Sequence, residues 1–456
     1  MINFETLFSK QFQSKPKCKV GIIGSNGNFG YTFISQILLM EKTIVLRAVC
    51  DLSIEKSIEF LKKRGINETK LYPCFTKAEI AKVPSDGIVV LQDSKLMACT
   101  DIDVMVEAAG NPESSALNAE LCILAGKHVA MVSKESDVIA GPYLYRLAKS
   151  KGVVYSIAIG DQPANLINWI SYFQALGIEI IAAGKSSEYD FVYDLDTGKF
   201  QYRDQVRTIP ELKKYWKMGD MKTTLAERSR LLSEFPQFAV PDYNEMNVVA
   251  NATGLLPSCP RLHYPIANVA EIADIYSLRK DGGLIEKPGV LDSFNCFHRF
   301  DEVSFAGGVF VVVKSHDRKV FDILRDKGHV FSKSGEYAAF YLPYHYMGLE
   351  APMSVLQSYY LNNLGYARCD NVATMVCRTE RDFKKGERLD LHTHHRCLED
   401  MYVTFEPTKD VPKDVAPYYL ISEKTVAKDI PAGTVVTLDM IDFTGSNLKR
   451  MFDSTR

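Results

Sequence analysis

The sequence lacks an excess of either charge, because 54 lysines and arginines stand against 56 aspartates and glutamates, for a formal net charge of −2. This balance excludes a whole-molecule field that would draw in nucleic acid or an anionic membrane, so any phosphate site must be local. Long apolar runs are also missing. The longest, Gly307 to Val313, falls far short of the roughly 20 residues that cross a bilayer. Residues 1–19 carry no apolar stretch typical of a secretion signal.

The sequence also lacks paired cysteines: it has 10 cysteines but no C-x-x-C motif. This absence argues against the paired thiols of redox and zinc sites. Several of the cysteines fall inside apolar runs, where a thiol packs as a small hydrophobe. Scattered cysteines are typical of a reducing compartment, so the sequence predicts a cytoplasmic protein.

What the sequence does contain is the composition of an ordinary folded protein, with 46% apolar and 24% charged residues. These values exclude disordered and collagen-like classes. At about 150 residues per domain, a chain of 456 residues predicts two to four domains with ample material for large cores.

Short apolar runs alternate with longer helical patterns between Lys19 and Ile157. The predicted order is a strand at 19–23, a helix at 29–40, strands at 43–50, 88–91 and 104–108, a helix at 112–125, a strand at 127–132, a helix at 141–151 and a strand at 153–157. Strand–helix–strand units form parallel sheets. The pattern therefore predicts an α/β fold with a Rossmann-type doubly wound sheet over residues 1–160, whose ligands lie at the carboxyl ends of the strands.

The pattern changes after Gly160. A polar stretch with little periodicity covers 190–221, followed by a helical 223–233, an apolar 248–256 and a strand-like 303–314. We expect a second, α+β domain over 161–362 that carries the substrate. One more long helix is expected at 343–362, returning to the first domain.

The segment 363–456 contains an internal repeat. A frame of a basic residue, Asp, an apolar residue, two further residues and Gly occurs at 381–386 and again at 428–433, 47 residues apart. Each copy follows a strand-like run, at 373–376 and 418–422, so each is interpreted as a strand and tight turn. Two unrelated glycine turns are the alternative interpretation.

The strongest local signal is a glycine-rich loop between the first predicted strand and helix. Gly24 permits a tight turn, Gly27 lets the backbone approach a pyrophosphate, and Gly30 lets helix and strand pack closely. Asp51 follows at the end of the next strand, where a carboxylate meets ribose hydroxyls. The alternative is a purely structural turn with a capping Asp. We expect a dinucleotide site formed by Gly24, Asn26, Gly27, Asn28, Phe29, Gly30 and Asp51.

Asp51 also bears on the choice of dinucleotide. A carboxylate bonds a free 2′-hydroxyl and repels a 2′-phosphate, so the physics favours NAD over NADP. Lys56 and Ser53 lie close enough in the sequence to soften that preference.

Two further loops are predicted at strand ends, on the ligand side of the sheet. One holds Ala109 and Gly110, and the other holds Lys134. Both are expected to line the nicotinamide. A lysine fixed at such a position donates to the alkoxide that develops during hydride transfer to a carbonyl. The alternative for Lys134 is a surface residue that caps a strand.

Seven motifs then occur together: the glycine-rich loop, Glu107 to Pro112, Val132 to Glu135, Gly160 to Pro163, Ala182 to Lys185, Glu245 to Gly254 and Pro343 to His345. Nearly end to end, the chain resembles the homoserine-dehydrogenase-like oxidoreductases that carry a C-terminal SAF domain. The resemblance implies that 363–456 is a mostly-β SAF module of β-clip fold. It also implies that the central domain forms a homodimer or a homotetramer. One branch of the group acts as a second type of 1-deoxy-D-xylulose 5-phosphate reductoisomerase, with NADPH and a divalent metal.

The resemblance fails at two positions. Homoserine dehydrogenases place an Asp and, four residues later, a Lys on one helix face to bind and protonate their substrate, and the matching positions here are Asn247 and Asn251. Amides supply neither the cation for an oxyanion nor the carboxylate for an amine, so an amino-acid substrate is disfavoured. Lys134 does match the lysine that those enzymes keep beside the nicotinamide.

Candidates exist for each need of the reductoisomerase chemistry. Asp161 and Glu245 are expected to hold Mg²⁺ or Mn²⁺, or to move a proton, with ordinary capping and helix-surface roles as the alternative. Lys185 is expected to anchor a phosphate or polarise an oxygen. The catalytic candidates are thus Lys134, Asp161, Lys185, Glu245 and Asn251, and Glu350 is a further candidate for contact with the dinucleotide.

A cluster of histidines at 392–395, with Cys397, invites a zinc interpretation. Its spacing matches no zinc pattern, so a polar loop is the better interpretation.

Three functions follow. The first is NADPH-dependent conversion of 1-deoxy-D-xylulose 5-phosphate, a small phosphorylated sugar, to 2-C-methyl-D-erythritol 4-phosphate in isoprenoid precursor synthesis. The second is an NAD(P)-dependent dehydrogenase of another polyol or keto acid, without isomerisation or metal. The third is a non-catalytic protein in which the dinucleotide regulates binding through the SAF module.

Overall fold

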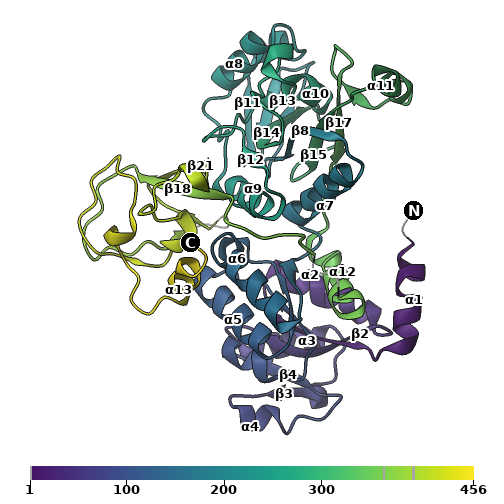
Figure 1. The fold of residues 1–456 in the computed structure, drawn as a ribbon, viewed down its shortest axis with the longest axis vertical. Helices are drawn as coiled ribbons and strands as arrows, with labels where there is room; N and C mark the ends of the chain where they lie inside the picture. The colour runs from purple at the N-terminus through teal and green to yellow at the C-terminus, as the bar shows by residue number, and fades with distance from the viewer. Residues whose placement is uncertain (1–2, 363–364, 393–395) are drawn as a thin grey trace.

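The computed structural model describes residues 3–362, 365–392 and 396–456. Figure 1 shows a parallel sheet with its helices at one end of the molecule, a second sheet at the other end, and the C-terminal region packed beside the junction of the two. Helices α6 and α9 face each other at that junction. No helix among the described residues is long and apolar enough to cross a membrane.

The first region, within residues 3–160, is a parallel sheet of seven strands in the order β3-β4-β2-β1-β5-β6-β7. Its elements are α1 (Phe4–Ser14), β1 (Cys18–Ile23), α2 (Asn28–Ile37), β2 (Ile44–Cys50), α3 (Ile54–Lys63), β3 (Leu71–Pro73), α4 (Lys77–Ile80), β4 (Ile88–Leu91), β5 (Val104–Glu107), α5 (Pro112–Leu124), β6 (His128–Met131), α6 (Lys134–Lys151) and β7 (Tyr155–Ile157).

The order of these strands places a topological switch point at β1. This strand pairs with β2 on one side and β5 on the other, both in parallel. Ligands of such sheets bind outside the carboxyl ends of the strands at the switch point. The predicted doubly wound α/β fold is therefore confirmed, and the glycine-rich loop lies at the position where that fold binds nucleotides.

One boundary in this region was predicted wrongly. The sequence pattern started a helix at Gly141, but α6 begins at Lys134, and Pro142 lies inside it. Gly141 and Pro142 look like a helix start, because proline is favoured in the first turn of a helix. Lys134 is therefore the first residue of a helix and not part of a loop.

The second region is built on a mixed sheet. Its elements are α7 (Gln162–Ala175), β8 (Glu179–Ser186), β9 (Phe191–Tyr193), β10 (Lys199–Tyr202), β11 (Gln205–Thr208), α8 (Met221–Leu231), α9 (Val240–Thr253), β12 (Leu256–Pro257), β13 (Ile266–Ala267), α10 (Ile272–Ile275), β14 (Val290–His298), β15 (Val309–Lys314), α11 (Arg318–Arg325), β16 (Val330–Phe331) and β17 (Tyr337–Leu342). Strand β8 lies between β14 and β15, parallel to the first and antiparallel to the second. Because β8 is central, its inward side chains, including Lys185, are fully enclosed.

Three expectations about the second region need correction. The polar stretch 190–221 contains the strands β9, β10 and β11, and the strand expected at 303–314 begins only at Val309. Residues 343–346 are not helical: the chain forms a short 3-10 turn, then α12 (Pro352–Leu356) and one π-helical turn to Leu361. This segment does return to the first region, where Val355 and Tyr360 join the core formed around β1 and α2.

The C-terminal region consists of short antiparallel pairs and one helix: β18 (Ala373–Thr379), β19 (Leu391–His392), β20 (Cys397–Leu398), β21 (Met401–Pro407), β22 (Thr425–Val426), β23 (Ile441–Asp442) and α13 (Asn447–Asp453). It is mostly β in character, as expected. The strand expected at 418–422 is wrong, because Tyr418–Leu420 form a 3-10 turn. His394 and His395 of the histidine cluster lie outside the described residues.

The two copies of the repeated frame pair with each other. Phe383 and Ile430, at the same place in each frame, exchange both backbone hydrogen bonds at 2.8 Å. Asp382 accepts from the Ala432 amide at 2.8 Å, and Asp429 accepts from the Lys385 amide at 2.8 Å. Each bond from the first frame to the second is thus matched by the same bond from the second frame to the first. The two frames therefore have a local two-fold relation. Two unrelated turns would not produce it, so the repeat is structural.

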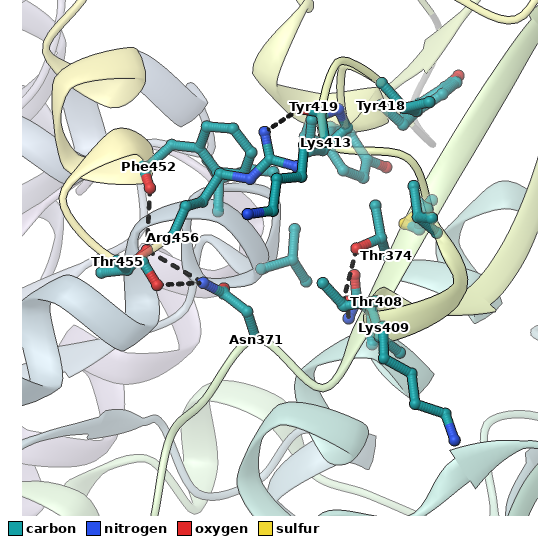
Figure 2. A pocket seen from close by; sticks show the side chains of 18 residues that line it. Asn371, Thr374, Thr408, Lys409, Lys413, Tyr418, Tyr419, Phe452, Thr455 and Arg456 are labelled. Carbon is teal, nitrogen blue, oxygen red and sulfur yellow. Dashed lines mark hydrogen bonds between the residues drawn. The ribbon is translucent and has the colours of Figure 1, made fainter.

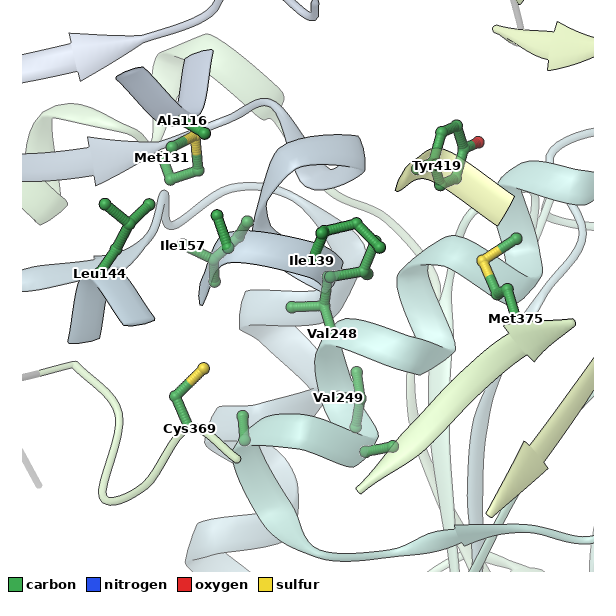
Figure 3. Packing of buried hydrophobic residues seen from close by; sticks show 14 of the residues in the cluster. Ala116, Met131, Ile139, Leu144, Ile157, Val248, Val249, Cys369, Met375 and Tyr419 are labelled. Atoms are coloured by element: carbon green, nitrogen blue, oxygen red, sulfur yellow. The ribbon is translucent and has the colours of Figure 1, made fainter. Parts of the chain in front are cut away.

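The three regions share one buried interior where α6, α9 and β18 meet. Figure 3 shows Ile139 of α6, Val248 and Val249 of α9, Met375 of β18 and Tyr419 around this point. Each of these side chains is at most 4% exposed. Burying an aliphatic side chain of this size contributes about 1.5–3 kcal/mol, so the C-terminal region is docked firmly on α6 and α9.

Candidate active site

The glycine-rich loop forms the turn between β1 and α2 and leaves room for a ligand. Gly24 has a φ of 87°, and a Cβ there would lie 2.4 Å from the Ala108 carbonyl oxygen. A Cβ on Gly30 would lie 2.3 Å from the Gly24 carbonyl oxygen. A Cβ on Gly27 would meet only the Gly24 oxygen, at 3.7 Å. The first two glycines are therefore required by packing inside the protein, while Gly27 faces open space, as a phosphate approach requires.

The start of α2 is free to bind an anion. Its N-cap, Gly27, provides no side-chain hydrogen bond to the helix amides, and Asn26, Gly27 and Asn28 are exposed. Uncapped amides at a helix start carry the positive end of the helix dipole. Phe29 continues the first turn of the same helix. The loop predicted from the sequence thus has the geometry of a phosphate cradle.

Asp51 lies at the end of β2, against the same loop. Its carboxylate accepts hydrogen bonds from the Asn26 and Leu52 amides, each at 2.7 Å. These bonds fix the carboxylate beside the cradle, where the sequence predicted contact with a ribose.

The two strand-end loops are adjacent to each other. Ser133 donates to buried Glu107 at 2.5 Å and accepts from the Gly110 amide at 2.7 Å. Because Ser133 directly precedes Lys134, this contact positions the start of α6 against the loop that holds Ala109 and Gly110. Burial raises the pKa of Glu107, which the Ser133 bond partly offsets.

Five charged side chains form one line of alternating sign at the junction of the first two regions, here called the charge chain: Asp161, Lys134, Glu245, Lys185 and Asp242. The Lys134 ammonium lies 2.9 Å from Asp161 Oδ2 and 2.5 Å from Glu245 Oε1. The Lys185 ammonium lies 2.6 Å from Asp242 Oδ1 and also contacts Glu245 Oε2. Glu245 therefore uses one oxygen for each lysine and joins the two pairs.

The five members of the charge chain come from four structural elements. Lys134 begins α6, Asp161 caps the start of α7 by accepting from the Gln162 amide at 2.9 Å, and Lys185 lies in β8. Asp242 and Glu245 lie three residues apart on α9, and that spacing places them on one helix face. The chain is thus assembled from three helices and one strand.

Burial varies along the charge chain. The side chains of Lys134 and Asp161 are 18% and 14% exposed, whereas those of Lys185 and Asp242 are 1% and 0% exposed. A substrate entering from the nucleotide side therefore reaches Lys134 first. The enclosed pair, with the Tyr264 hydroxyl donating to Asp242 at 3.2 Å, forms the support behind it.

The charge chain keeps its lysines protonated. Burial alone would lower the pKa of Lys134, but the Asp161 and Glu245 carboxylates outweigh it and raise that pKa above its ordinary value. At Lys185, too, burial alone would lower the pKa, but the Asp242 and Glu245 carboxylates outweigh it and raise that pKa. Burial would raise the pKa of Glu245, yet the two ammonium groups hold it well below its usual range. The raised pKa favours the ammonium form of Lys134, in which it donates hydrogen bonds.

Four of the five predicted catalytic residues thus come together, and Asn251 does not join them. Its side-chain oxygen accepts from the Val372 amide at 2.9 Å and from the Ala373 amide at 3.4 Å. Asn247 donates to the Ala373 carbonyl oxygen at 2.7 Å. Asn247 and Asn251 therefore hold the start of β18.

Glu350 lies in the segment that returns to the first region. Glu350 lies just after the 3-10 turn Met347–Leu349, and accepts from the Tyr346 amide at 3.0 Å. That turn packs against the start of α2 and against Gly160. Among the described residues, no group of three or more His, Cys, Asp or Glu side chains is arranged to hold a metal ion.

Two residues at the site were missed by the sequence analysis. Asp242 was detectable, because a carboxylate three residues before Glu245 shares its helix face. Arg396 gave no local signal: it reaches from the C-terminal region to the Gly110 carbonyl oxygen and, at 3.3 Å, to the Ala109 carbonyl oxygen.

Residues 160–351 match the family model described as the catalytic domain of oxidoreductase DRL. The match covers less than half of the chain, and it likens that segment to the catalytic domain of an oxidoreductase. Four members of the charge chain lie within the matched segment, and Lys134 lies outside it. No curated protein matches the chain.

Solved structures with a similar arrangement include three with bound dinucleotide. A 1-deoxy-D-xylulose 5-phosphate reductoisomerase from Zymomonas mobilis with NADPH is 13% identical, with a TM-score of 0.28 over 38% of this chain and 46% of that chain. A DOX-P reductoisomerase with NADPH, fosmidomycin and magnesium is 15% identical, with a TM-score of 0.32 over 52% and 59%. The WlbA dehydrogenase from Bordetella pertussis with NADH and UDP-GlcNAcA is 14% identical, with a TM-score of 0.28 over 40% and 48%. Each alignment covers about half of the solved chain.

Proposed function

We propose that this oxidoreductase is an NADPH-dependent reductoisomerase that converts 1-deoxy-D-xylulose 5-phosphate to 2-C-methyl-D-erythritol 4-phosphate. The observation that carries the proposal is the charge chain, in which the partly exposed ammonium group of Lys134, beside the loops at the carboxyl ends of β5 and β6, is held between two carboxylates. A fixed cation at this place stabilises the negative charge that develops on a carbonyl oxygen as it is reduced.

The dinucleotide would occupy the cradle at the start of α2. Gly27 and the uncapped amides of α2 would bind its pyrophosphate, and Asp51 would bind its adenosine ribose. When bound, the dinucleotide supplies the hydride for the carbonyl carbon. The fixed Asp51 carboxylate favours a free 2′-hydroxyl over a 2′-phosphate, so NADH is to be tested beside NADPH.

In the reaction, the ketose would first rearrange to an isomeric branched aldehyde: the bond between C3 and C4 breaks, a bond between C2 and C4 forms, and the C3 hydroxyl proton passes to the C2 oxygen. Lys134 would donate a hydrogen bond to the oxygen of that aldehyde. As the hydride reaches the aldehyde carbon, the electron pair of the C=O bond moves to the oxygen, which Lys134 stabilises and which takes its proton from solvent. Lys185 would act through Glu245, whose charge it shares, and thereby hold Lys134 in place.

Asp161 and Glu245 fit a hard divalent ion in donor type and placement. Their oxygens converge on one cation, the Lys134 ammonium, from two different elements, and carboxylates are the preferred protein ligands of Mg²⁺ and Mn²⁺. When bound there, such an ion would polarise the keto and hydroxyl oxygens of the substrate. The rest of its shell would come from water or substrate, since the described residues offer no third ligand.

A second function, a dehydrogenase of another polyol or keto acid without isomerisation or metal, is favoured by one observation. The Lys134 ammonium already stands between Asp161 and Glu245, so the charge chain is complete without a metal ion.

The deciding experiment measures oxidation of NADPH and NADH by the purified protein with 1-deoxy-D-xylulose 5-phosphate and Mg²⁺ or Mn²⁺. The proposal expects turnover that EDTA abolishes and that fosmidomycin, a metal-chelating phosphonate, inhibits. Turnover of another carbonyl compound that is insensitive to EDTA would replace the proposal with the second function. Binding of dinucleotide with no turnover of any carbonyl would contradict both and support a nucleotide-sensing protein.

The remaining expectations stand as part of this proposal. We place the reaction in the cytoplasm, as the free cysteines suggest, and treat residues 1–160, 161–362 and 363–456 as the dinucleotide-binding, catalytic and SAF domains. A homodimer or homotetramer is expected, and light scattering on the purified protein tests it.

A further inference from the structure

A cavity of about 390 Å³ lies between the C-terminal region and the two helices that carry the active-site charges. Its walls include Thr374 and Met375 of β18, Val138 and Ile139 of α6, and Asn247 of α9. Figure 2 shows the cavity and the polar side chains around it. Its volume falls within the range of natural sites for small molecules.

The cavity carries an excess of positive charge. Lys409, Lys413 and Arg456 line it, and no acidic side chain does. None of the three forms an ion pair with a described residue. Arg456 donates to the Lys413 carbonyl oxygen at 2.5 Å, and its guanidinium lies 4.7 Å from the centre of the Phe452 ring. In Figure 2 the ends of Lys413 and Arg456 lie on the same side of the cavity, whereas Lys409 extends away from them.

Part of the lining is apolar and buried, and one buried hydroxyl lies in the lining close to Lys413. Val138, Ile139 and Met375 are at most 5% exposed. Tyr419 is 1% exposed, lines the cavity, and has a buried hydroxyl with no hydrogen-bond partner among the described residues. A buried hydroxyl without a partner is unfavourable, and a hydrogen bond to a ligand oxygen would satisfy it.

We propose that this cavity is a regulatory site for an amphipathic anion, a phosphate monoester or diphosphate with a short apolar chain. The anionic group would lie at Lys413 and Arg456, and the chain would lie along Val138, Ile139 and Met375. Arg and Lys recognise phosphate oxygens through charge-assisted hydrogen bonds. An inorganic anion alone would leave the apolar wall unused, and a neutral hydrocarbon would leave the cations unused.

The walls of this cavity belong to the elements that hold the charge chain. Val138 lies one helical turn beyond Lys134 on α6, and Asn247 lies two residues beyond Glu245 on α9. Protein interiors are close-packed, so a ligand that moves one helix against the other also moves the residues one turn away. Occupancy of the cavity would therefore change the Lys134–Glu245 contact without any contact between the ligand and the substrate.

The binding test uses isothermal titration calorimetry of n-hexyl phosphate into the full chain saturated with dinucleotide. We expect saturable binding, at least tenfold weaker in K413A and in R456A and unchanged in K82A, an exposed lysine of the first region. A second variant, V411W, fills the cavity from a half-buried loop position and should abolish the heat. 1-Hexanol and inorganic phosphate should each bind at least tenfold more weakly than hexyl phosphate.

Three results would overturn the site. They are the absence of saturable binding to the native chain, an unchanged affinity in K413A and V411W, and hexanol binding as tightly as hexyl phosphate. None of them depends on the reaction that the enzyme catalyses, so they leave the proposed function untouched.

The regulatory part rests on the proposed function. Hexyl phosphate should change the turnover number at saturating substrate at least twofold in the native enzyme and not in K413A, whose basal turnover should equal that of the native enzyme. Competition with substrate that persists in K413A, or binding without any change in turnover, would show that occupancy does not regulate the enzyme.

Discussion

Glu245 is the residue on which the active-site arrangement depends. One of its oxygens holds Lys134, the donor that a substrate reaches, and the other holds Lys185, which is fully enclosed. Because the two lysines share one carboxylate, a change at either end of the charge chain alters the proton affinity at the other. Single substitutions in the charge chain can therefore separate residues that would touch the substrate from residues that hold them in place.

Replacing Lys134 by Ala should lower turnover by about 100- to 1,000-fold, the loss expected when a donor to a developing oxyanion is removed. The dissociation constant of the dinucleotide, measured by fluorescence, should change less than threefold, because the cradle at α2 does not include this side chain. The matched control is Lys82→Ala, an exposed lysine of the first region. Equal losses of turnover and dinucleotide affinity would remove the proposed role.

Replacing Lys185 by Met should destabilise the protein by about 3–5 kcal/mol, because Asp242 and one oxygen of Glu245 would remain buried without their cation. Urea unfolding measures the loss. Adding Asp242→Asn should recover at least half of it, since the amide carries no charge. A double variant no more stable than Lys185→Met would show that the enclosed pair does not account for the loss.

The pair His263–Asp292 makes stability depend on pH. Burial alone would lower the pKa of His263, but the hydrogen bond and charge of Asp292, 2.5 Å away, raise it from 6.5 to about 10. A folded-state pKa above the unfolded one stabilises the protein fully below pH 6.5, and this stabilisation is lost as the pH rises through 10. The loss over that interval is about 5 kcal/mol. The difference in unfolding free energy between the native protein and His263→Gln should shrink between pH 6.5 and 10, and a constant difference would contradict the shift.

At the scale of elements, α9 joins the active site to the C-terminal region. Its face at Asp242 and Glu245 belongs to the charge chain, while Asn247 and Asn251 hold the backbone of Val372 and Ala373. An amide can donate to a carbonyl and accept from an N–H, which neither Asp nor Lys can do alone. The two asparagines are therefore suited to fastening β18.

Replacing Asn247 by Leu should cost roughly 1–3 kcal/mol, because the Ala373 carbonyl oxygen loses its buried donor. Differential scanning calorimetry should show a lower unfolding temperature and hydrogen exchange should increase at residues 373–379. Asn67→Ala, at an exposed cap of the first region, is the control. An unchanged exchange rate in β18 would show that this contact does not fasten it.

The sequence predicted those elements whose signals are local. Alternating strands and helices of the first region were found because parallel strands are buried on both faces and read as continuous apolar runs. The glycine-rich loop and Asp51 were found for the same reason, since their spacing is set within one β–α–β unit. The start of α6 was missed because the packing of Ser133 on Glu107, and not the Gly–Pro pair, decides where the helix begins.

Residues whose positions depend on distant parts of the chain were beyond local patterns. Tyr418–Leu420 carry apolar side chains typical of a strand, yet they form a turn packed on α6. Arg396 reaches the Ala109–Gly110 loop from 286 residues away. Likewise, Lys134, Lys185 and Glu245 were each chosen as candidates, but only the fold shows that one carboxylate joins both lysines.

At the scale of the whole molecule, the C-terminal region is fastened to the first region through Glu113 of α5. This carboxylate accepts from Lys424 at 2.6 Å, from Ser446 at 2.7 Å and from the Asn447 amide at 2.6 Å. Arg450 adds a contact to Glu120 of the same helix at 2.6 Å. The C-terminal region thus contacts both of the other regions, and its position affects the loop at Gly110 and the cavity at Lys413 together.

Replacing Glu113 by Ala should loosen this attachment, because four hydrogen bonds to one half-buried carboxylate are lost. Limited proteolysis should release the segment after residue 365 at least fivefold faster than in the native protein. The control is Glu59→Ala, which removes an exposed ion pair with Lys63 on α3 and should behave as the native protein does. Equal cleavage rates in all three proteins would show that other contacts decide the docking.

The reciprocal pairing of the frames around Phe383 and Ile430 has a consequence for biosynthesis. Each frame receives its hydrogen bonds from the other, and 47 residues separate them. At roughly 5–20 residues per second, the first copy is synthesised several seconds before its counterpart. The two halves of the pair can therefore join only after both have left the ribosome, and the backbone groups of the first copy stay without their native partners over that interval.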